Sequence, residues 1–367
     1  MRRMRKMVLI LVLIVIARGA NAQVPTYPMS WRVSPSGVSA SLRGLSVASA
    51  SKSPHGPVVW ASGSGGTILR SDDRGKIWKQ LHVEGAEKLD FRGIRAFNEK
   101  IAYAISIGEG DKSRIYKTID GGGTWELQYT DKRSAFFLDD IVCFTEKNCF
   151  VLGDPIEGKF LMLSTEDGRH WSELPRENMP AIIPGEGAFA ASGTSLAVFG
   201  KSDIYFGTGG GATARVFHSP NFGRDWSVAD TPLAAGNASS GVFSVLRVRN
   251  TVVAVGGDYK ATAEGSHAAA ISMDGGATWK LAAAQPGGFR SAVASVDGLT
   301  LVSVGPNGAD LSDDLGMTWK PTQAANLNSV AVSHAKNIWG VGAKGMIATL
   351  LEIPVIVDSL PPDTQQN

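Results

Sequence analysis

Several residue types that carry common protein chemistries are scarce in this sequence. The 367 residues include only two cysteines and six histidines, and no histidine or third cysteine lies at metal-ligand spacing from the two cysteines. Helical periodicity over a useful length is missing, which excludes helical repeats and the βαβ unit of dinucleotide-using enzymes. The glycine runs 63–66 and 207–211 lack the lysine and the following helix of a phosphate loop. The sequence therefore predicts neither a cofactor nor a metal site.

The first 22 residues have the form of a secretory signal peptide. Basic residues lie near the N-terminus, an apolar run from Val8 to Ala17 follows, and Ala20-Asn21-Ala22 gives a cleavage pattern ahead of Gln23. The run is too short for a stable membrane anchor, and the cleavage position has no cysteine, which argues against a lipoprotein. We expect cleavage after Ala22 and a periplasmic or secreted protein; a retained anchor is the alternative.

Without that segment the chain is nearly neutral and too long for one ordinary core. The segment holds five of the 36 basic residues and no acidic one, so 31 basic residues stand against 34 acidic ones and the net charge is −3. A nearly neutral chain without basic runs is not expected to bind a nucleic acid or an anionic membrane surface. The 345 residues from Gln23 onward indicate several domains or a repeat architecture.

The two cysteines, Cys143 and Cys149, flank a short segment that is typical of a hairpin tip between two apolar strands. Disulfides persist in an oxidising compartment, so a cross-hairpin disulfide is one interpretation. A reduced, half-buried pair is the other, because only suitably facing positions on paired strands accept the bond.

One octet of the form Ser/Thr-x-Asp-x-Gly-x-x-Trp recurs along the chain. Its tryptophans are 47, 46, 55, 53 and 40 residues apart, a period that suits four short strands and their turns, as in a propeller blade. Short alternating runs rich in Val, Ile, Ala and Gly lie between the octets and are typical of strands. The acid position and the tryptophan of the six copies are Asp73 and Trp78, Asp120 and Trp125, Glu166 and Trp171, Asn221 and Trp226, Asp274 and Trp279, and Asp314 and Trp319.

Each octet is predicted to form a hairpin turn between two strands. The Asp carboxylate accepts hydrogen bonds from backbone amides of the turn, and the Gly adopts a conformation that other residues disfavour. The Trp begins the outgoing strand and buries a large apolar area between neighbouring hairpins. Because the motif is copied along the chain, we interpret its acids as structural and not catalytic.

A seventh repeat follows the last octet and predicts how the ring closes. Residues 327–348 repeat the strand-turn-strand rhythm of residues 42–69, but no octet follows them. A strand beginning at Trp31 would supply the missing outer strand, and pairing the two ends of the chain would remove exposed edges. We therefore predict an all-β fold, with a signal peptide at 1–22, one seven-bladed β-propeller over 23–352 and a disordered tail at 353–367.

The octets resemble the Asp-box repeats of bacterial neuraminidases. Their arrangement over nearly the whole chain is similar to that of the photosystem II stability and assembly factor-like propellers. The resemblance implies a propeller fold. Asp boxes occur in sialidases, other glycoside hydrolases, sorting receptors and assembly factors, so the motif implies a scaffold and the function depends on a site.

The loops that lead into the innermost strands ring the mouth of the central channel, where propellers commonly bind ligands. Arginine forks match carboxylates, so several arginines at this mouth suit an acidic peptide or a carboxylated ligand. The alternative is that the charges pair with one another and only satisfy the channel lining. The candidate binding residues are Arg43, Arg92, Asp139, Asp154, Glu186 and Arg290, and Asn328 lies near the same ring.

Two functions from different classes fit these features. The first is a non-catalytic, monomeric propeller that binds an exported or envelope protein or an acidic peptide and assists assembly or stability. The second is a sialidase-like glycoside hydrolase, although Phe91-Arg92-Gly93-Ile94 lacks the proline of the sialidase arginine motif. A hydrolase needs two carboxylates at a set separation, or a tyrosine with a glutamate partner. The candidates for these roles are Asp139, Asp140, Asp154, Glu186, Tyr103, Tyr116, Tyr205 and Tyr259.

Overall fold

The computed structural model describes residues 29–48, 56–322, 326–334 and 336–352. The predicted signal peptide at 1–22 and the predicted tail at 353–367 lie outside these residues and stay predictions. Within the described ranges, no helix is long and apolar enough to cross a membrane.

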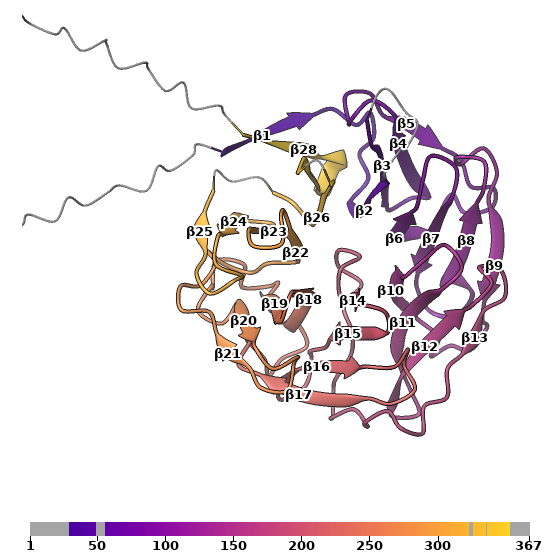
Figure 1. Cartoon of the computed structure of the whole chain (residues 1–367). Helices are drawn as coiled ribbons and strands as arrows, with labels where there is room; N and C mark the ends of the chain where they lie inside the picture. Colours follow the sequence, from indigo (N-terminus) through magenta and orange to yellow (C-terminus); the bar gives the residue numbers. More distant parts are fainter. Residues whose placement is uncertain (1–28, 49–55, 323–325, 335, 353–367) are drawn as a thin grey trace, which may run out of the picture.

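Seven four-stranded antiparallel sheets form a ring, so the predicted seven-bladed β-propeller is confirmed (Figure 1). We number the blades along the chain and name the strands of each blade from the innermost outward. Blade 1 consists of β2 (Leu42–Ala48), β3 (Val58–Gly63), β4 (Thr67–Ser71) and β5 (Lys79–Leu81); blade 2 of β6 (Asp90–Ala96), β7 (Ala102–Ile107), β8 (Arg114–Thr118) and β9 (Glu126–Thr130); blade 3 of β10 (Leu138–Cys143), β11 (Cys149–Ile156), β12 (Lys159–Thr165) and β13 (Ser172–Glu173); blade 4 of β14 (Leu196–Phe199), β15 (Asp203–Gly207), β16 (Ala214–Ser219) and β17 (Ser227–Thr231); blade 5 of β18 (Ser240–Val248), β19 (Thr251–Asp258), β20 (Ala269–Ser272) and β21 (Lys280–Leu281); blade 6 of β22 (Ala292–Ser295), β23 (Leu301–Gly305), β24 (Gly308–Ser312) and β25 (Lys320–Pro321); and blade 7 of β26 (Ser329–Val332), β27 (Ile338–Val341), β28 (Ile347–Glu352) and β1 (Met29–Ser34).

Blade 7 joins the two ends of the chain. Strand β1 pairs antiparallel with β28, from Ser34 opposite Ile347 to Met29 opposite Glu352, and forms the outer strand of the blade (Figure 1). The predicted closure by the terminal strands is therefore confirmed. Closure leaves no open sheet end between the first and last blades, where unpaired backbone groups would otherwise invite association.

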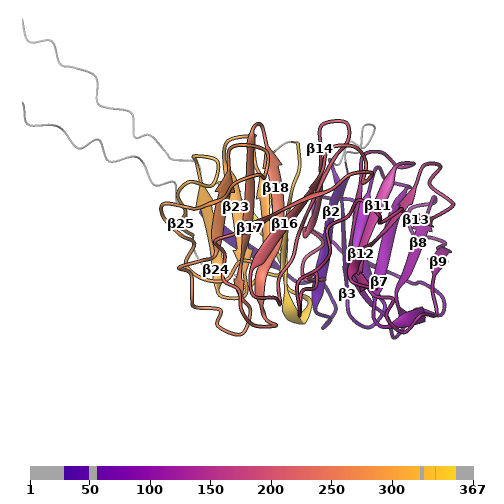
Figure 2. The same cartoon turned by 90° about the horizontal axis from the view of Figure 1, so that it is seen from below.

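The antiparallel order of each blade gives the ring two different faces, seen edge-on in Figure 2. The connections between blades and the hairpins between second and third strands lie at one face, which we call the mouth face. The hairpins between first and second strands and the octet turns lie at the other, which we call the octet face. The 3-10 helices η1 (Gly110–Lys112) and η2 (Ala343–Gly345) both lie between second and third strands, at the mouth face.

Burial decreases from the inner strands to the outer ones. Every residue of β3 and of β27 is buried, whereas β21 and β25 have only two residues each, both exposed. The sequence explains this difference, because β3 and β27 consist of small, β-branched and aromatic residues, whereas β21 and β25 begin with lysine. Apolar clusters fill the spaces between neighbouring blades and hold them side by side.

The octet turns are held by hydrogen bonds between their own residues. Asp73 Oδ1 accepts hydrogen bonds from the backbone N–H groups of Lys76 and Ile77, at 3.0 and 2.9 Å, and from the Ser71 hydroxyl at 2.8 Å. In the equivalent turn of blade 2, the backbone amide and the hydroxyl of Thr124 lower the pKa of Asp120 to about 2. The equivalent side chains at positions 221, 274 and 314 also accept a backbone N–H group at 2.8–2.9 Å.

The octet of blade 3 differs from the sequence prediction by one residue. The carboxylate that accepts the turn's backbone amides, from Arg169 and His170 at 2.8 and 2.9 Å, belongs to Asp167. Thr165 supplies the hydroxyl, and the predicted acid Glu166 is exposed and outside this network. The prediction of Glu166 was wrong because Ser164-Thr165 and Glu166-Asp167 offer two registers, and the turn uses the shorter one.

Aromatic side chains on two second strands each link an octet to the blade before it. Tyr103 of blade 2 donates its hydroxyl to the carbonyl of Gly168 in the octet of blade 3, at 3.0 Å. Trp339 of blade 7 donates its ring N–H to the carbonyl of Arg74 in blade 1, at 3.2 Å. A Cβ on Gly75, whose φ is +82°, would lie 2.9 Å from the Trp339 ring nitrogen. The octet glycine is therefore needed for both its conformation and the close approach of the neighbouring blade.

Cys143 and Cys149 form a disulfide at the hairpin between β10 and β11, where they lie directly opposite each other. Of the two sequence interpretations, the structure has the bonded pair.

Candidate functional site at the channel mouth

Backbone irregularities in the inner strands place side chains at the channel mouth. Arg43, Arg92 and Asp139 each occupy the position where the register of the inner strand shifts by one residue against its neighbour. Phe243 occupies the same position in β18. A β-bulge of this kind leaves one residue outside the regular ladder and redirects its side chain. In these four blades the bulge therefore delivers one side chain to the same ring.

The connection from β13 to β14 runs through this ring. It covers residues 174–195 and accounts for the widest spacing between octet tryptophans, the 55 residues from Trp171 to Trp226. Its last part, which we call the channel segment (residues 187–195), makes hydrogen bonds to inner-strand residues of blades 1, 2, 3, 5 and 7 and to the start of blade 6. Sequence reasoning did not predict this segment.

Buried serines fix the second half of the channel segment. Ser192 donates its hydroxyl to the carbonyl of Ser291 at 2.8 Å, and Ser329 donates to the carbonyl of Ser192 at 2.7 Å. All three serines are at most 3% exposed. Asp140 Oδ2 also accepts the backbone N–H of Leu196 at 2.9 Å, just after the segment. These contacts tie the second half of the channel segment to the inner strands of blades 3 and 7 and to the start of blade 6.

The arginines of the mouth hold the first half of the channel segment. Arg43 Nη1 donates to the carbonyl of Ala191 at 3.0 Å, and Arg92 Nη1 donates to the carbonyl of Ala190 at 2.9 Å. Asp154 Oδ1 accepts the backbone N–H of Ala188 at 3.2 Å. Three of the predicted site residues therefore lie together, and each already bonds the protein's own backbone.

The two arginines differ in how many of their N–H donors are available for a ligand. Asp90 accepts hydrogen bonds from Nε and Nη2 of Arg92, both at 2.9 Å, so all three nitrogens of that guanidinium are engaged. The half-buried guanidinium of Arg43 makes one hydrogen bond within the described residues. Burial lowers the pKa of Arg43, and the positive charge of Arg92 lowers it further. Arg43 thus has N–H donors available for a ligand, and the neighbouring positive charge of Arg92 favours the binding of an anion there.

Three carboxyl groups, those of Asp139, Asp140 and Asp154, lie near one another at the mouth ends of β10 and β11. Asp139 is 1% exposed, and its Oδ2 has no hydrogen-bond partner among the described residues. Burial raises the pKa of Asp139 well above its ordinary range, and the neighbouring charges of Asp154 and Asp140 add to the rise. Burial also raises the pKa of Asp154, and it raises the pKa of Asp140 to about 6 against the opposing effect of Arg95. Because a raised pKa favours the protonated, uncharged form, the three carboxyl groups offset the positive charge of the arginines only in part.

Two predicted site residues are not available at the mouth. Arg290 is 2% exposed, and its Nε donates to Asp310 in β24 at 2.5 Å. Glu186 is 5% exposed, and Arg215 in β16 donates two hydrogen bonds to it. The predicted open cluster of three guanidiniums is therefore wrong, because only Arg43 and Arg92 lie together at the mouth. Arg290 and Glu186 instead fit the alternative interpretation, in which each charge is paired with an opposite charge of the protein.

The remaining predicted ring residue, Asn328, joins the first and last blades. Its side-chain amide donates to the carbonyl of Leu42 at 2.9 Å, beside a backbone hydrogen bond from Leu42 to Gly342 at 3.0 Å. This role is structural, because the bonds span the junction that closes the ring.

The candidate tyrosines of a hydrolase lie in structural contacts. Tyr103 donates to backbone carbonyls, Tyr116 accepts a hydrogen bond from Arg114, and Tyr205 lies against Arg247 and donates to the carbonyl of Gly275. In the described part of the chain, none of their hydroxyls bonds a glutamate carboxylate. Tyr259 is 45% exposed and lies against Phe243 near the mouth.

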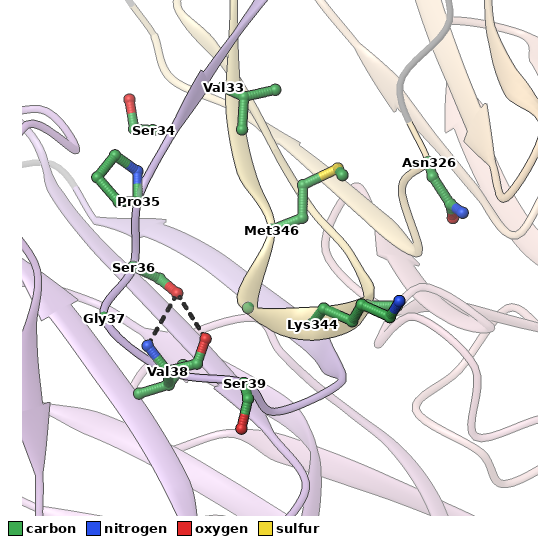
Figure 3. Close-up of a pocket in the computed structure, with 12 residues that line it drawn as sticks. Val33, Ser34, Pro35, Ser36, Gly37, Val38, Ser39, Asn326, Lys344 and Met346 are labelled. Carbon is green, nitrogen blue, oxygen red and sulfur yellow. Dashed lines mark hydrogen bonds between the residues drawn. The ribbon is translucent and has the colours of Figure 1, made fainter.

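A separate pocket opens on the mouth face beside blade 7 (Figure 3). It has a volume of about 780 Å³ and lies between the connection from β1 to β2, the helix η2 and Asn326. Lys344 is the one charged residue of its described lining, and its side chain is exposed. The connection is fixed to η2 by a hydrogen bond from Gly345 N–H to the carbonyl of Ala40 at 2.7 Å. None of the predicted site residues lines this pocket.

Comparisons with known proteins agree with this fold. No family model matches the sequence, and no curated protein matches it. Among solved structures, YCF48 from Cyanidioschyzon merolae is similar with a TM-score of 0.62 and 15% identity over 88% of this chain and 98% of that one. YCF48 bound to D1 peptide gives 0.60 and 14%, over 88% and 96%. A streptogramin B lyase gives 0.59 and 11%, over 88% and 97%. The chain is thus similar to whole single propellers, as the assembly factor-like resemblance implied, and at these identities the likeness shows the fold.

Proposed function

We propose that this protein is an exported, non-catalytic β-propeller that binds an acidic segment of another exported or envelope protein at the mouth face and serves that partner as an assembly or stability factor. The observation that carries the proposal is the half-buried guanidinium of Arg43, which lies beside Arg92 and makes a single hydrogen bond to the residues that the structure describes. Recognition of a peptide by a propeller of the same fold, as in YCF48 bound to D1 peptide, supports a peptide ligand.

The chemistry of the mouth favours a carboxylate over other ligand groups. A guanidinium presents parallel N–H donors that match the two oxygens of a carboxylate, and such charge-assisted bonds are about twice as strong as neutral ones. Water reaches Arg43 only in part, so a carboxylate there is screened less than on an open surface. Removing this contact is expected to weaken binding roughly tenfold to a hundredfold, as for a lost hydrogen bond to a charged group.

The test uses the mature protein from Gln23 and a fluorescent hexapeptide of alternating Asp and Ala. Arg43→Gln is expected to weaken binding at least tenfold, whereas Arg32→Gln is expected to leave it unchanged, because Arg32 is exposed on the outer strand of blade 7. A peptide of alternating Asn and Ala should not bind. Equal affinity of the wild-type and Arg43→Gln proteins would overturn the proposed site.

A second measurement separates binding from catalysis. The wild-type, Arg43→Gln and Arg32→Gln proteins are used as bait in an envelope extract, and each is also incubated with fluorogenic sialosides and other glycosides. A partner retained by the wild-type and Arg32→Gln proteins but lost by Arg43→Gln supports the proposal. Hydrolysis of any glycoside that disappears in Arg43→Gln would instead make the protein an enzyme.

A further inference from the structure

The mouth arginines are occupied in the free protein by a short stretch of the protein's own backbone. Residues 188–191 read Ala-Phe-Ala-Ala, and the carbonyls of Ala190 and Ala191 accept the hydrogen bonds of Arg92 and Arg43. These are the donors that an acidic peptide would use. The stretch therefore lies where a ligand's acceptors are expected to lie.

The channel segment is anchored unequally along its length. Its second half is fixed by buried serines and by Asp140, as described above. Its first half is held by the hydrogen bonds to the two arginines and to Asp154, and by the ring of Phe189, which stacks on Phe243 with centroids 3.9 Å apart and planes 12° apart. Phe189 is only partly buried. Ala191, which is 8% exposed, also packs against Phe243 and Phe289, and Gly187 just before the stretch exchanges two backbone hydrogen bonds with Gly209 at 3.0 Å. Residues 188–191 are thus held by three hydrogen bonds with side chains and by one small apolar cluster.

Glycines border this weakly held stretch. Gly185 and Gly187 precede it, and Gly193 follows it; Gly185 and Gly193 have φ values of +80° and +67°. Backbone of this kind absorbs changes of φ and ψ at low cost, which is typical of hinge positions. The three alanines between them, Ala188, Ala190 and Ala191, are small, so moving them exposes little apolar surface.

We propose that residues 188–191 are a built-in competitor for the channel mouth: they occupy Arg43 and Arg92 in the free protein and are displaced when the carboxylates of a bound peptide take over both guanidiniums. The inference rests on the proposed function. An exchange of this kind keeps both arginines hydrogen-bonded at every stage and replaces neutral carbonyl acceptors with stronger charged ones. The released carbonyls face solvent, so no buried polar group is left without a partner.

The competitor predicts that weakening its anchor tightens peptide binding. The observed affinity of a site that is open only part of the time is reduced by the open fraction. Phe189→Ala removes the stacking contact with Phe243, which holds the closed state, and is expected to tighten binding of the Asp-Ala hexapeptide about twofold to tenfold. Phe189→Leu keeps apolar volume without stacking and should give a smaller change, which guards against a variant that folds poorly.

Phe144→Ala is the matched control. Phe144, like Phe189, is a partly buried phenylalanine that packs on another aromatic ring, here Phe222 with centroids 5.3 Å apart, but it lies at the hairpin between β10 and β11 on the octet face. Its replacement should leave peptide affinity unchanged.

Hydrogen exchange followed by mass spectrometry gives an independent readout. Peptide binding should lower the protection of backbone amides in residues 188–191 if the stretch is displaced, and should raise it if the ligand binds on top. Lower protection together with tighter binding by Phe189→Ala supports the competitor. Raised protection, or weaker or equal binding by Phe189→Ala, overturns the competitor and leaves the proposed function standing. No binding by either protein overturns the proposed function and the competitor with it.

Discussion

Replacing Asp139 with Asn is expected to stabilise the folded protein at neutral pH. The carboxyl group lies at a bulge in β10, is 1% exposed, and has an oxygen without a partner in the described structure. Asp154 and Asp140 are close enough to raise its pKa, which burial raises most. The folded protein therefore holds a carboxyl group in a place where its charge is unfavourable, and an uncharged amide of the same shape removes that cost.

The sign of the pH dependence follows from the direction of the shift. The pKa of Asp139 is higher in the folded protein than in the unfolded chain, where an aspartate titrates near pH 4, so the folded state binds the proton more tightly. The stability that accompanies the protonated carboxyl is complete below about pH 4 and is lost as the pH rises toward the folded-state pKa. Leaving a buried polar group without a partner costs about 1–3 kcal/mol. We therefore expect Asp139→Asn to raise the free energy of unfolding by about 1–3 kcal/mol at pH 8 and by about zero at pH 4.

Urea denaturation of the mature protein at several pH values measures this difference. The adjacent residue provides the contrast, because Asp140 accepts hydrogen bonds from the backbone N–H groups of Ile141 and Leu196, at 2.7 and 2.9 Å. An amide cannot accept at both ends, so Asp140→Asn should destabilise the protein by about 1–3 kcal/mol. A destabilised Asp139→Asn variant at pH 8, or a gain that does not change between pH 4 and pH 8, would refute the reasoning.

Three further predictions concern the scaffold and the chain ends. Asp167→Asn should lower the thermal midpoint, by an amount that shrinks as the pH falls below about 4 because hydrogen bonds lower the pKa of Asp167, whereas Glu166→Gln should not lower it; equal effects would contradict the revised octet register. Joint replacement of Cys143 and Cys149 by Ser should cost about 2 kcal/mol, the value for closing a short loop, with the wild-type thiols resisting alkylation until reduced. The exported protein should begin at Gln23 in mass spectrometry, and an intact N-terminus would favour a retained anchor.

The fold was predictable because its signals repeat. A single octet is a weak signal, but six copies at a regular spacing indicate one turn at the same place in successive blades. The seventh blade and its closure followed from the same rhythm, since a repeat without an octet needs a strand from elsewhere. The misplaced acid at Glu166 shows the limit: where two hydroxyl residues precede two acidic ones, pattern matching leaves a one-residue ambiguity that the backbone resolves.

The site was predictable in position and much less in detail. Repeat register placed Arg43, Arg92 and Asp139 at equivalent points, and the shared bulge shows why this worked. The repeat register does not reveal which side chains form ion pairs. It therefore could not show that Arg290 pairs with Asp310, twenty residues later in the chain, and is not available at the mouth. The channel segment left one signal in the sequence, the wide spacing before Trp226, but an insertion of that kind does not reveal where it folds.

The balance of charges at the mouth indicates how a partner is recognised. Asp90 accepts the hydrogen bonds of Arg92, and Asp139, Asp140 and Asp154 add further carboxyl groups at the mouth, so the mouth presents no large positive field to attract an acidic chain from a distance. Long-range steering needs such a field and fades with salt, whereas a guanidinium fork acts at contact. We therefore expect association rates in the ordinary range of about 10⁵–10⁷ M⁻¹s⁻¹, with little dependence on salt. Most of the effect of Arg43→Gln should then appear as faster dissociation, and a mainly slower association would show that steering contributes more than the local geometry does.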